Sequence, residues 1–417
     1  MVYFPFIYFT LLLFFCIYHT KRFGISAAAI AWIDLSAFCS ILVDLTDTYD
    51  EWGVLPNSLY WGGVLTYCLL WTIVFIPLIR LDSMKISRYT ISKPHLFRYL
   101  CYFLIACVFI YFFSPEIFSN IRERISLNTS DAYDLLRDKS YETRESKGMF
   151  WLWIPMVVTN AWPLVLLCWF ISLTICRQSR LLSAILLISS VALMFINFVS
   201  GGRGTLIWWA YTFFAYFCFF SPLMEKKIKR TIAIIGIGAI AIIGIGVMYI
   251  TISRFDSGFQ DTIYKSLIGY AGEQLNNFCG ALQVVPLWDD YTKQLFPFTH
   301  LLLEHKSFDA NDYISRLTET YNLEQTNLFF TFFMRIAFDV GLIGMTMYLI
   351  LYLLIFHFTA IPRGGTYSFS HIIMLSLLMN IPIRGLFNYP FVTHVQTFYI
   401  LLSLFLFFLF NQPSKRL

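Results

Sequence analysis

Charged residues are scarce in this chain of 417 residues. They account for 13% of it, whereas soluble domains carry about 25%. Hydrophobic residues reach 58% and aromatic residues 19%. Such a composition excludes a water-soluble surface, and the many aromatic rings suit a lipid-facing exterior with interfacial belts. We therefore expect an all-α protein, built as a single polytopic transmembrane helical bundle over residues 1–417.

Paired cysteines and metal-binding motifs are also missing. No CxxC or Cys/His cluster occurs among the nine cysteines, so we expect them to pack as small side chains and predict no metal site. The net charge of +5 comes from bases scattered among short loops, which argues against a nucleic-acid partner. The N-terminus lacks a basic region before its apolar run and does not resemble a cleavable signal peptide. No internal repeat is evident, which weighs against transporters built from duplicated halves.

Long apolar runs, in contrast, are abundant. Each is close to the roughly 20 residues that a helix needs to cross the hydrocarbon core of a bilayer. Asp34 and Asp44 interrupt the second run, which makes it the weakest candidate. The predicted spans, roughly eleven in number, cover residues 3–18, 25–45, 59–79, 96–113, 150–175, 182–199, 205–223, 231–251, 329–356, 370–383 and 395–410.

Positive charges sort the connecting loops into two sets. The basic loops at residues 21–22, 80–98, 177–180, 226–230 and 363, together with 415–416, all fall on one side of the predicted bundle. By the positive-inside rule that side is cytoplasmic. The N-terminus is therefore expected outside and the C-terminus inside.

Two polar segments then face outward, a first loop at residues 114–148 and a large loop at 252–325. The large loop is far longer than an ordinary connection, and loops of that length are usually functional or disordered. Apolar residues recur at near-helical spacing over 255–270 and 313–321, with a proline-containing stretch at 285–298 between them. We expect a helical hairpin that lies across the outer mouth of the bundle.

Four arginines occur at the predicted outer ends of spans: Arg203, Arg254, Arg335 and Arg384. Charged groups near membrane depth are expensive and are by default candidates for function. Each could instead reach the interface or pair with an acid, as Arg335 could with Asp339 four residues later. A guanidinium group stays charged and binds phosphate oxygens in pairs, so the natural target is the pyrophosphate of a membrane lipid.

Groups suited to a hydroxyl-rich ligand surround these arginines in the sequence. Aromatic rings stack on sugars, while amides and carboxylates bond to hydroxyl groups, although each such residue alone could equally be structural. The candidates are Tyr264, Tyr270, Glu273, Gln274, Asn276, Asn277, Gln325, Thr326, Asn327, Thr331, Asn388 and Tyr389.

Several short motifs follow one another in a characteristic order along the chain. A Gly-Gly-Arg-Gly turn at 201–204 lies between two spans, and Arg254 follows the next span. After the large loop, Thr326-Asn327 leads into Arg335 and then into Asp-Val-Gly at 339–341. In this order, and on these sides of the membrane, the chain resembles the Wzy-type O-antigen polymerases, or oligosaccharide repeat unit polymerases. The likeness is clearest in the second half of the chain.

The resemblance implies a glycosyltransferase of GT-C type in a bacterial inner membrane, with its active site facing the periplasm. Its substrates would be undecaprenyl-pyrophosphate-linked oligosaccharide units, joined into O-antigen or a related polysaccharide. No nucleotide sugar, metal or other cofactor is implied. Membrane lipid would be a partner, and a chain-length regulator and a flippase are the protein partners it suggests.

Roles can be assigned on this hypothesis. Arg203, Arg254 and Arg335 would stabilise the departing pyrophosphate. Glu273 is a candidate general base, with Asp256, Asp261 and His305 as alternatives. The predicted substrate-binding residues are Arg384, Asn277, Thr326, Asn327, Thr331, Asp339, Tyr264 and Tyr270.

Three other functions stay open. An O-antigen ligase, which transfers lipid-linked glycan to lipid A core, would use a His in the large loop, where His300 and His305 lie. A polysaccharide flippase or other transporter would favour repeated halves and short loops, unlike this chain. A membrane acyltransferase would need a basic His motif on the cytoplasmic side, which we do not find.

Overall fold

The computed structural model describes most of the chain. The described residues are 1–46, 58–84, 86, 88–115, 117–119, 122, 154, 158, 161–176, 178–199, 204–254, 268–293, 295–297, 300, 310–321, 323, 330–362, 365–391 and 394–411. Within helices, the side chains of residues 193, 195–199, 249–254, 310–312, 314 and 394–395 are not described.

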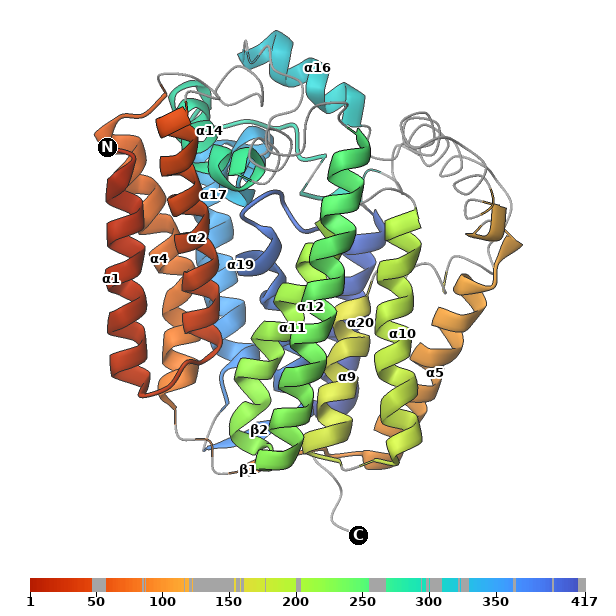
Figure 1. Ribbon diagram of the computed structural model, residues 1–417. Coiled ribbons are helices and arrows are strands. Elements are labelled where there is room, and N and C mark those ends of the chain that lie inside the picture. Colours follow the sequence, from red (N-terminus) through yellow and green to blue (C-terminus); the bar gives the residue numbers. More distant parts are fainter. Residues whose placement is uncertain are drawn as a thin grey trace. The chain divides into compact units, whose positions relative to one another are not determined.

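The described residues are overwhelmingly helical (Figure 1). The α-helices are α1 (Tyr3–Thr20), α2 (Ile25–Thr46), α4 (Trp61–Ser83), α5 (Pro94–Phe112), α9 (Trp162–Thr174), α10 (Arg180–Val199), α11 (Gly204–Phe220), α12 (Lys226–Arg254), α14 (Gly269–Val284), α16 (Ala310–Tyr321), α17 (Phe332–Ile355), α18 (Phe369–Leu378), α19 (Asn380–Arg384) and α20 (His394–Asn411). A 3-10 turn, η1 (Ser221–Leu223), follows α11, and a π turn, η3 (Phe356–Ala360), follows α17. Two short strands, β1 (Arg88–Thr90) and β2 (Thr366–Ser368), complete the described elements.

The helices have the length and composition of membrane spans. Seven are long and apolar enough to cross a bilayer: Tyr3–Thr20, Ile25–Thr46, Trp61–Ser83, Pro94–Phe112, Gly204–Leu223, Lys226–Met248 and Phe332–Ala360. Shorter apolar helices cover Trp162–Thr174, Arg180–Ala192, Phe369–Arg384 and Gln396–Asn411. A helix thus lies over at least part of every predicted span, and the all-α prediction is confirmed. The number of spans beyond these seven and the likeness to GT-C enzymes stay predictions.

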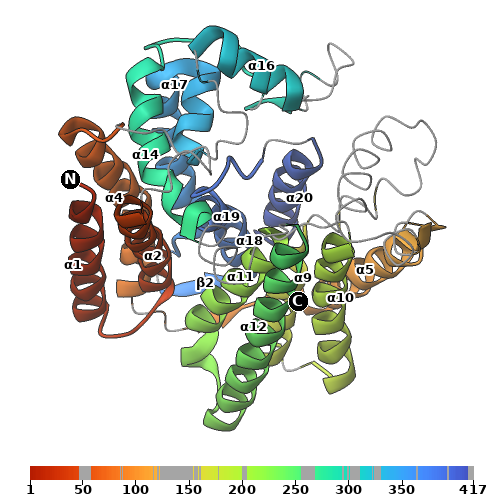
Figure 2. The same cartoon turned by 45° about the horizontal axis from the view of Figure 1, so that its top comes forward.

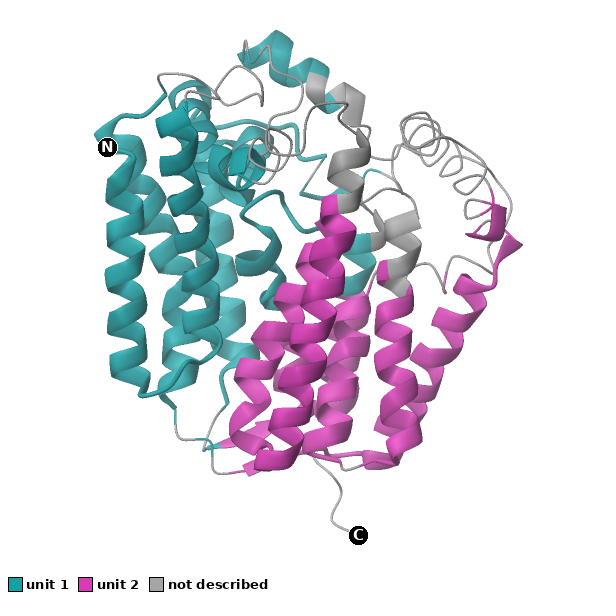
Figure 3. Cartoon of the chain, in the orientation of Figure 1, with its two compact units in different colours: residues 1–86, 263–365, 378–400 teal, residues 87–262, 366–377, 401–417 magenta. Residues whose placement is uncertain are grey.

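The chain divides into two compact units (Figure 3). Unit 1 comprises Met1–Ile86, Ile263–Gly365 and Leu378–Ile400, and unit 2 comprises Ser87–Thr262, Thr366–Leu377 and Leu401–Leu417. Neither unit is continuous in sequence. Unit 1 contains α1, α2, α4, α14, α16, α17 and α19, so it joins the first three helices to most of the predicted large outer loop.

Helix α14 packs into unit 1 along α2, as Figures 1 and 2 both show. The Ser36 hydroxyl donates to the carbonyl of Ala271 at 2.5 Å, and the Ser40 hydroxyl donates to that of Gly272 at 2.6 Å. A Cβ at Gly272 would lie 2.6 Å from the Cys39 carbonyl oxygen. Small residues therefore let the two backbones approach closely, as is common between membrane helices.

Helix α2 continues through Asp34, the residue that weakened its prediction as a span. The Thr10 hydroxyl of α1 lies 3.1 Å from each carboxylate oxygen of Asp34 and donates to them. A hydrogen-bond donor from the neighbouring helix lowers the cost of placing an acid midway along a membrane helix. The predicted helix over residues 25–45 is confirmed.

Contacts within unit 2 bring together chain segments that the pattern of positive charges had placed on one side of the membrane. Strands β1 and β2 pair in parallel, with Arg88 opposite Thr366. Nearby, the Lys93 ammonium group donates to the Leu409 carbonyl at 2.8 Å, in the last turn of α20. The segments before α5 and α18 and the end of α20 therefore lie at one end of unit 2. All three were predicted on the same side of the membrane.

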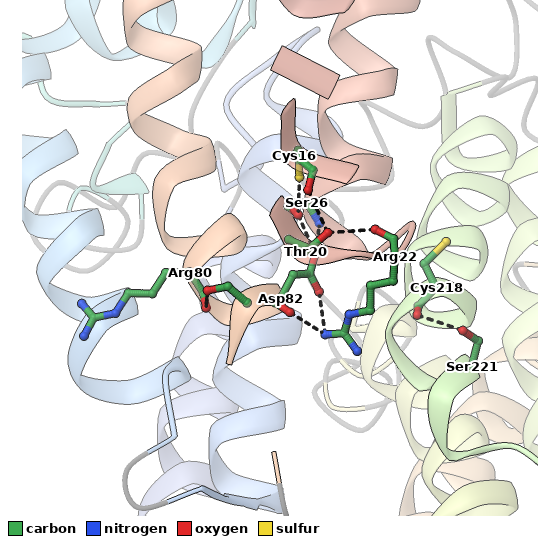
Figure 4. Close-up of polar contacts among 9 residues, drawn as sticks. Cys16, Thr20, Arg22, Ser26, Arg80, Asp82, Cys218 and Ser221 are labelled. Carbon is green, nitrogen blue, oxygen red and sulfur yellow. Dashed lines mark hydrogen bonds and ion pairs between the residues drawn. The ribbon is translucent and has the colours of Figure 1, made fainter. Parts of the chain in front are cut away.

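A buried acid joins α4 to the start of α2 at one end of unit 1 (Figure 4). The Asp82 carboxylate accepts hydrogen bonds from the Ser26 backbone N–H at 2.8 Å and from the Ser26 hydroxyl at 2.6 Å. Arg22 forms an ion pair with the same carboxylate at 3.2 Å. A Cβ at Gly24 would lie 2.3 Å from Asp82 Oδ2, so this approach requires glycine. Asp82 thus satisfies an N–H group in the first turn of α2 that has no acceptor within that helix.

We predict that Asp82→Ala lowers the free energy of unfolding by about 1.5 to 3 kcal/mol, because it leaves the buried N–H of Ser26 without an acceptor and removes the ion-pair partner of Arg22. Thermal unfolding of the purified protein in detergent measures the change. Asp44→Ala, which removes an exposed acid from α2, should have a much smaller effect. Equal losses from the two variants would contradict this role of Asp82.

Candidate functional site

The four arginines divide between the two units. Arg203 lies outside the described residues, and Arg254 ends α12 with a side chain that is not described; both belong to unit 2. Arg335 and Arg384 belong to unit 1. The convergence of all four on one pyrophosphate therefore stays a prediction.

Arg335 and Arg384 lie on two helices whose ends are in contact. The Phe332 backbone N–H, at the start of α17, donates to the Gly385 carbonyl at 2.7 Å. Gly385 follows Arg384 at the end of α19, and a Cβ there would lie 2.7 Å from the Phe332 ring. The missing side chain lets the two helix ends touch. The helix ends that carry Arg335 and Arg384 therefore touch.

The Arg335 guanidinium group is surrounded by aromatic rings. Its carbon lies 4.8 Å from the ring centroid of Tyr313, in α16, and 5.9 Å from that of Phe330. Its Nε is buried and has no hydrogen-bond partner within the described residues. Thr331, the residue before α17, is also fully buried, and its hydroxyl lacks a partner among the same residues. Arg335 therefore brings a positive charge and an unused donor to this end of the unit.

Arg384 is half-buried at the end of α19, where contacts with α2 fix the backbone. The Trp32 indole N–H donates to the Ile383 carbonyl at 3.1 Å, and its ring meets that of Phe387 edge-on. The next turn closes locally, since the Asn388 backbone N–H donates to the Arg384 carbonyl at 3.2 Å. The Asn388 side-chain oxygen in turn accepts the Tyr389 N–H at 2.8 Å.

The Asp-Val-Gly motif at 339–341 marks a break in α17. Gly341 has φ 74° and ψ 177°, a conformation essentially confined to glycine. At this break, residues 286–293 and 295, which we call the clip segment, dock on the helix. The Leu342 and Ile343 N–H groups donate to the carbonyls of Pro286 at 3.1 Å and Leu287 at 3.0 Å.

Asp339, on the N-terminal side of the break, also bonds to the clip segment. Its carboxylate accepts the Leu295 backbone N–H at 2.8 Å, and its carbonyl accepts the Thr292 N–H at 3.2 Å. The side chain is fully buried. The acid that the sequence offered as a substrate ligand, or as a partner of Arg335, holds part of the large outer loop in place. A substrate-binding role for Asp339 stays a prediction.

Helix α16 confirms the helical spacing predicted over 313–321. Tyr313, Leu317 and Tyr321 are all buried, as that periodicity requires. An ionic cluster, which we call the latch, ties the helix to the clip segment. Arg316 forms an ion pair with Asp289, and the Tyr321 hydroxyl donates to the same carboxylate at 2.5 Å. The Arg316 guanidinium carbon also lies 4.1 Å from the Tyr291 ring centroid.

The latch favours one protonation state of each member. Burial opposes ionisation of Asp289, but hydrogen bonds from Arg316 and Tyr321 outweigh it and lower the pKa of this carboxyl. Burial, together with donation to Asp289, raises the pKa of Tyr321 to about 12. The latch therefore combines a carboxylate, a guanidinium and a neutral phenol over a broad range around neutral pH.

The polar residues of α14 are buried in unit 1. Glu273, Gln274, Asn276 and Asn277 are each at most 1% exposed, and the Asn277 amide donates to Glu273 at 3.1 Å. A general base must reach the hydroxyl that it deprotonates. The role predicted for Glu273 therefore requires a sugar to penetrate between α14 and its neighbours, and it stays a prediction.

Two further residues named in the sequence analysis can be placed. Tyr270 lies half-buried in the first turn of α14. His300, a candidate under the ligase alternative, has its Nε2 3.1 Å from the Thr292 hydroxyl. The predicted residues outside the described chain are Tyr264, Gln325, Thr326, Asn327, Asp256, Asp261 and His305.

Comparisons with protein-family models, with curated proteins and with solved structures found no match to this chain.

The sequence analysis missed three features of this region: Tyr313 as a neighbour of Arg335, Gly385 as the point of helix contact, and the latch between Asp289 and Arg316. The sequence showed the apolar stripe of α16, but it did not show that Tyr313 of this stripe lies against Arg335. In the described residues, no group of His, Cys, Asp and Glu is suited to a metal ion.

We predict that Gly341→Ala destabilises the protein by about 2 kcal/mol or more, because the conformation is strained for any other residue. A Cβ would also lie 2.5 Å from Trp288 Cα and 2.6 Å from the Leu287 carbonyl oxygen. Thermal unfolding in detergent provides the measurement. Gly238→Ala in α12, where a Cβ meets nothing within 4 Å, is the matched control and should be neutral or mildly stabilising.

We predict that Arg316→Leu costs about 1.5 to 3 kcal/mol at neutral pH, because it removes a hydrogen bond to a charged group. Asp289 has a lowered pKa, so its contribution is present above the ordinary value of 3.8 and disappears as the pH falls through the folded-state value. Tyr321 has a raised pKa, so its contribution is present below the ordinary value of 10.0 and is lost as the pH rises through about 12.

Unfolding temperatures of the two proteins, compared from pH 3 to pH 9, test this dependence. The difference should be constant near neutrality and shrink toward pH 3. Lys293→Leu serves as a control, because Lys293 lies 5.3 Å from the ring centroid of the same Tyr291 but has no carboxylate partner in the described chain. A difference that does not change with pH would rule out an ionic latch.

Proposed function

We propose that this chain is a membrane glycosyltransferase that polymerises oligosaccharide units carried on a polyprenyl pyrophosphate. The proposal joins the motif order of the sequence to the site in unit 1. Its substrates, undecaprenyl-pyrophosphate-linked units in a bacterial inner membrane, and a site facing the periplasm follow from the family resemblance.

The observation that supports the proposal is the contact between the start of α17, which carries Arg335, and the end of α19, which carries Arg384. Helix α16 lies against Arg335, and the clip segment is anchored further along α17; both come from the predicted outer loop. A buried guanidinium nitrogen with an unused donor, such as Arg335 Nε, costs free energy unless an anion or water completes it. A diphosphate provides both the negative charge and the acceptor oxygens.

The proposed reaction is a displacement at an anomeric carbon. A sugar hydroxyl of one lipid-linked unit attacks the reducing-end sugar of a growing chain, and a new C–O bond forms. The bond to the pyrophosphate oxygen breaks, and its electron pair leaves with the lipid pyrophosphate. The proton of the attacking hydroxyl passes to a general base, for which Glu273 is one candidate.

Arginines serve this reaction by stabilising the leaving group. Negative charge grows on the pyrophosphate in the transition state, and fixed donors stabilise it with little reorganisation. Removing one such donor typically costs about 2.7 to 4 kcal/mol of barrier. Arg335 would serve this role from the first turn of α17, and Arg384 from the end of α19, where the next residue, Gly385, accepts the Phe332 N–H.

The decisive experiment is complementation: each variant is expressed in a strain that lacks the gene, and the lengths of its surface glycans are compared on a gel. Arg335→Ala should collapse the ladder of polymer lengths to a single unit, with protein abundance and unfolding temperature close to wild type. Lys293→Ala, which removes another positive charge from the outer segment, should leave the ladder intact.

Other outcomes would point elsewhere. A full ladder with Arg335→Ala would reject the role of this residue. Lipid-linked polymer that accumulates without attachment to core lipid would indicate a ligase. Lipid-linked units that fail to reach the outer leaflet would indicate a flippase.

A further inference from the structure

We propose that Tyr313 is a positioning residue that holds Arg335 ready for an anion of the phosphate class. This inference rests on the proposed function for the identity of the anion as a diphosphate. The contact of Arg335 with the rings of Tyr313 and Phe330 lies within unit 1, where Tyr313 belongs to α16 and Arg335 to α17.

The geometry places the phenol ring against the guanidinium group. Tyr313 is 2% exposed, and its ring centroid lies 4.8 Å from the guanidinium carbon of Arg335. Phe330 is fully buried, with its centroid 5.9 Å from the same carbon. Attraction between a cation and an aromatic face is strongest where water is excluded, as it is around Arg335 Nε.

Tyr313 can act in this way because α16 is held at other points. The latch between Arg316 and Asp289 ties the middle of the helix to the clip segment. At its end, the Tyr321 ring packs against Phe338 of α17 with centroids 5.0 Å apart. The clip segment is itself bonded to α17 at the Gly341 break. The ring of Tyr313 is therefore part of a braced structure.

The chemistry of guanidinium explains what this arrangement favours. A ring on one face of the group leaves its donors directed along the plane, where two N–H groups can bind two phosphate oxygens. Stacking also removes rotamers that do not present this edge, so less entropy is lost when the anion binds. A lysine at this position could not reproduce the paired geometry.

Inorganic pyrophosphate is the first probe, because its binding does not require sugar transfer. Phenylglyoxal modifies accessible arginines, and mass spectrometry of peptides measures its reaction at Arg335 in the purified full-length protein. Pyrophosphate should protect Arg335 in the wild type. Tyr313→Leu should weaken this protection on the order of tenfold in pyrophosphate concentration, and Tyr313→Phe should stay within about twofold of wild type.

Two controls separate positioning from general damage to α16. Leu317→Ala removes buried apolar volume from the same helix and should lower the unfolding temperature without changing protection by pyrophosphate. Arg335→Lys combined with Tyr313→Leu should extend glycan no worse than Arg335→Lys alone, because Tyr313 acts through the guanidinium.

The outcomes distinguish this inference from the proposed function. Unchanged protection in Tyr313→Leu, or equal losses in Tyr313→Leu and Tyr313→Phe, would overturn the positioning role. Absence of protection in the wild type would overturn it as well. If protection behaves as expected but Arg335→Ala leaves the glycan ladder intact, Tyr313 positions an anion-binding arginine and the polymerase proposal fails.

Discussion

The break in α17 at Gly341 is the constraint on which the rest of unit 1 depends. A helix that stops and restarts leaves N–H groups without intrahelical acceptors, and these must be satisfied away from water. The carbonyls of the clip segment supply the acceptors, and Asp339 secures the same segment from the other side. This part of the predicted outer loop is therefore bound to α17 through backbone hydrogen bonds, which depend little on salt concentration.

This anchorage propagates to the charged groups. The clip segment carries Asp289, which engages Arg316 and so determines where α16 lies. Helix α16 in turn brings Tyr313 against Arg335. The two arginines differ in a way that matters for function. Arg316 is neutralised by a carboxylate, whereas Arg335 lies over an aromatic ring, which attracts the cation without neutralising its charge.

Much of the fold could be predicted because its causes are local. A run of about 20 apolar residues must form a helix in lipid, since only a helix satisfies its own backbone there. The boundaries of α1, α2, α4 and α5 accordingly match the predicted spans to within a few residues. The positive-charge rule placed the segments of β1 and β2 on one side of the membrane, and their pairing puts both at one end of unit 2. That this side is cytoplasmic stays a prediction.

The sequence by itself determined where the long apolar helices lie, which residues of α16 face inward, and which arginines stand at helix ends. It did not give α14, which spans Gly269–Val284, whereas the spacing predicted a helix over 255–270. Only the tertiary structure decided the partners of those charges, and it separated Asp339 from the role of a counterion to Arg335. The physical reason is distance along the chain. Hydrophobic periodicity acts over a few turns, whereas the pairing of Asp289 with Arg316, or of Arg335 with Tyr313, depends on how separate segments pack.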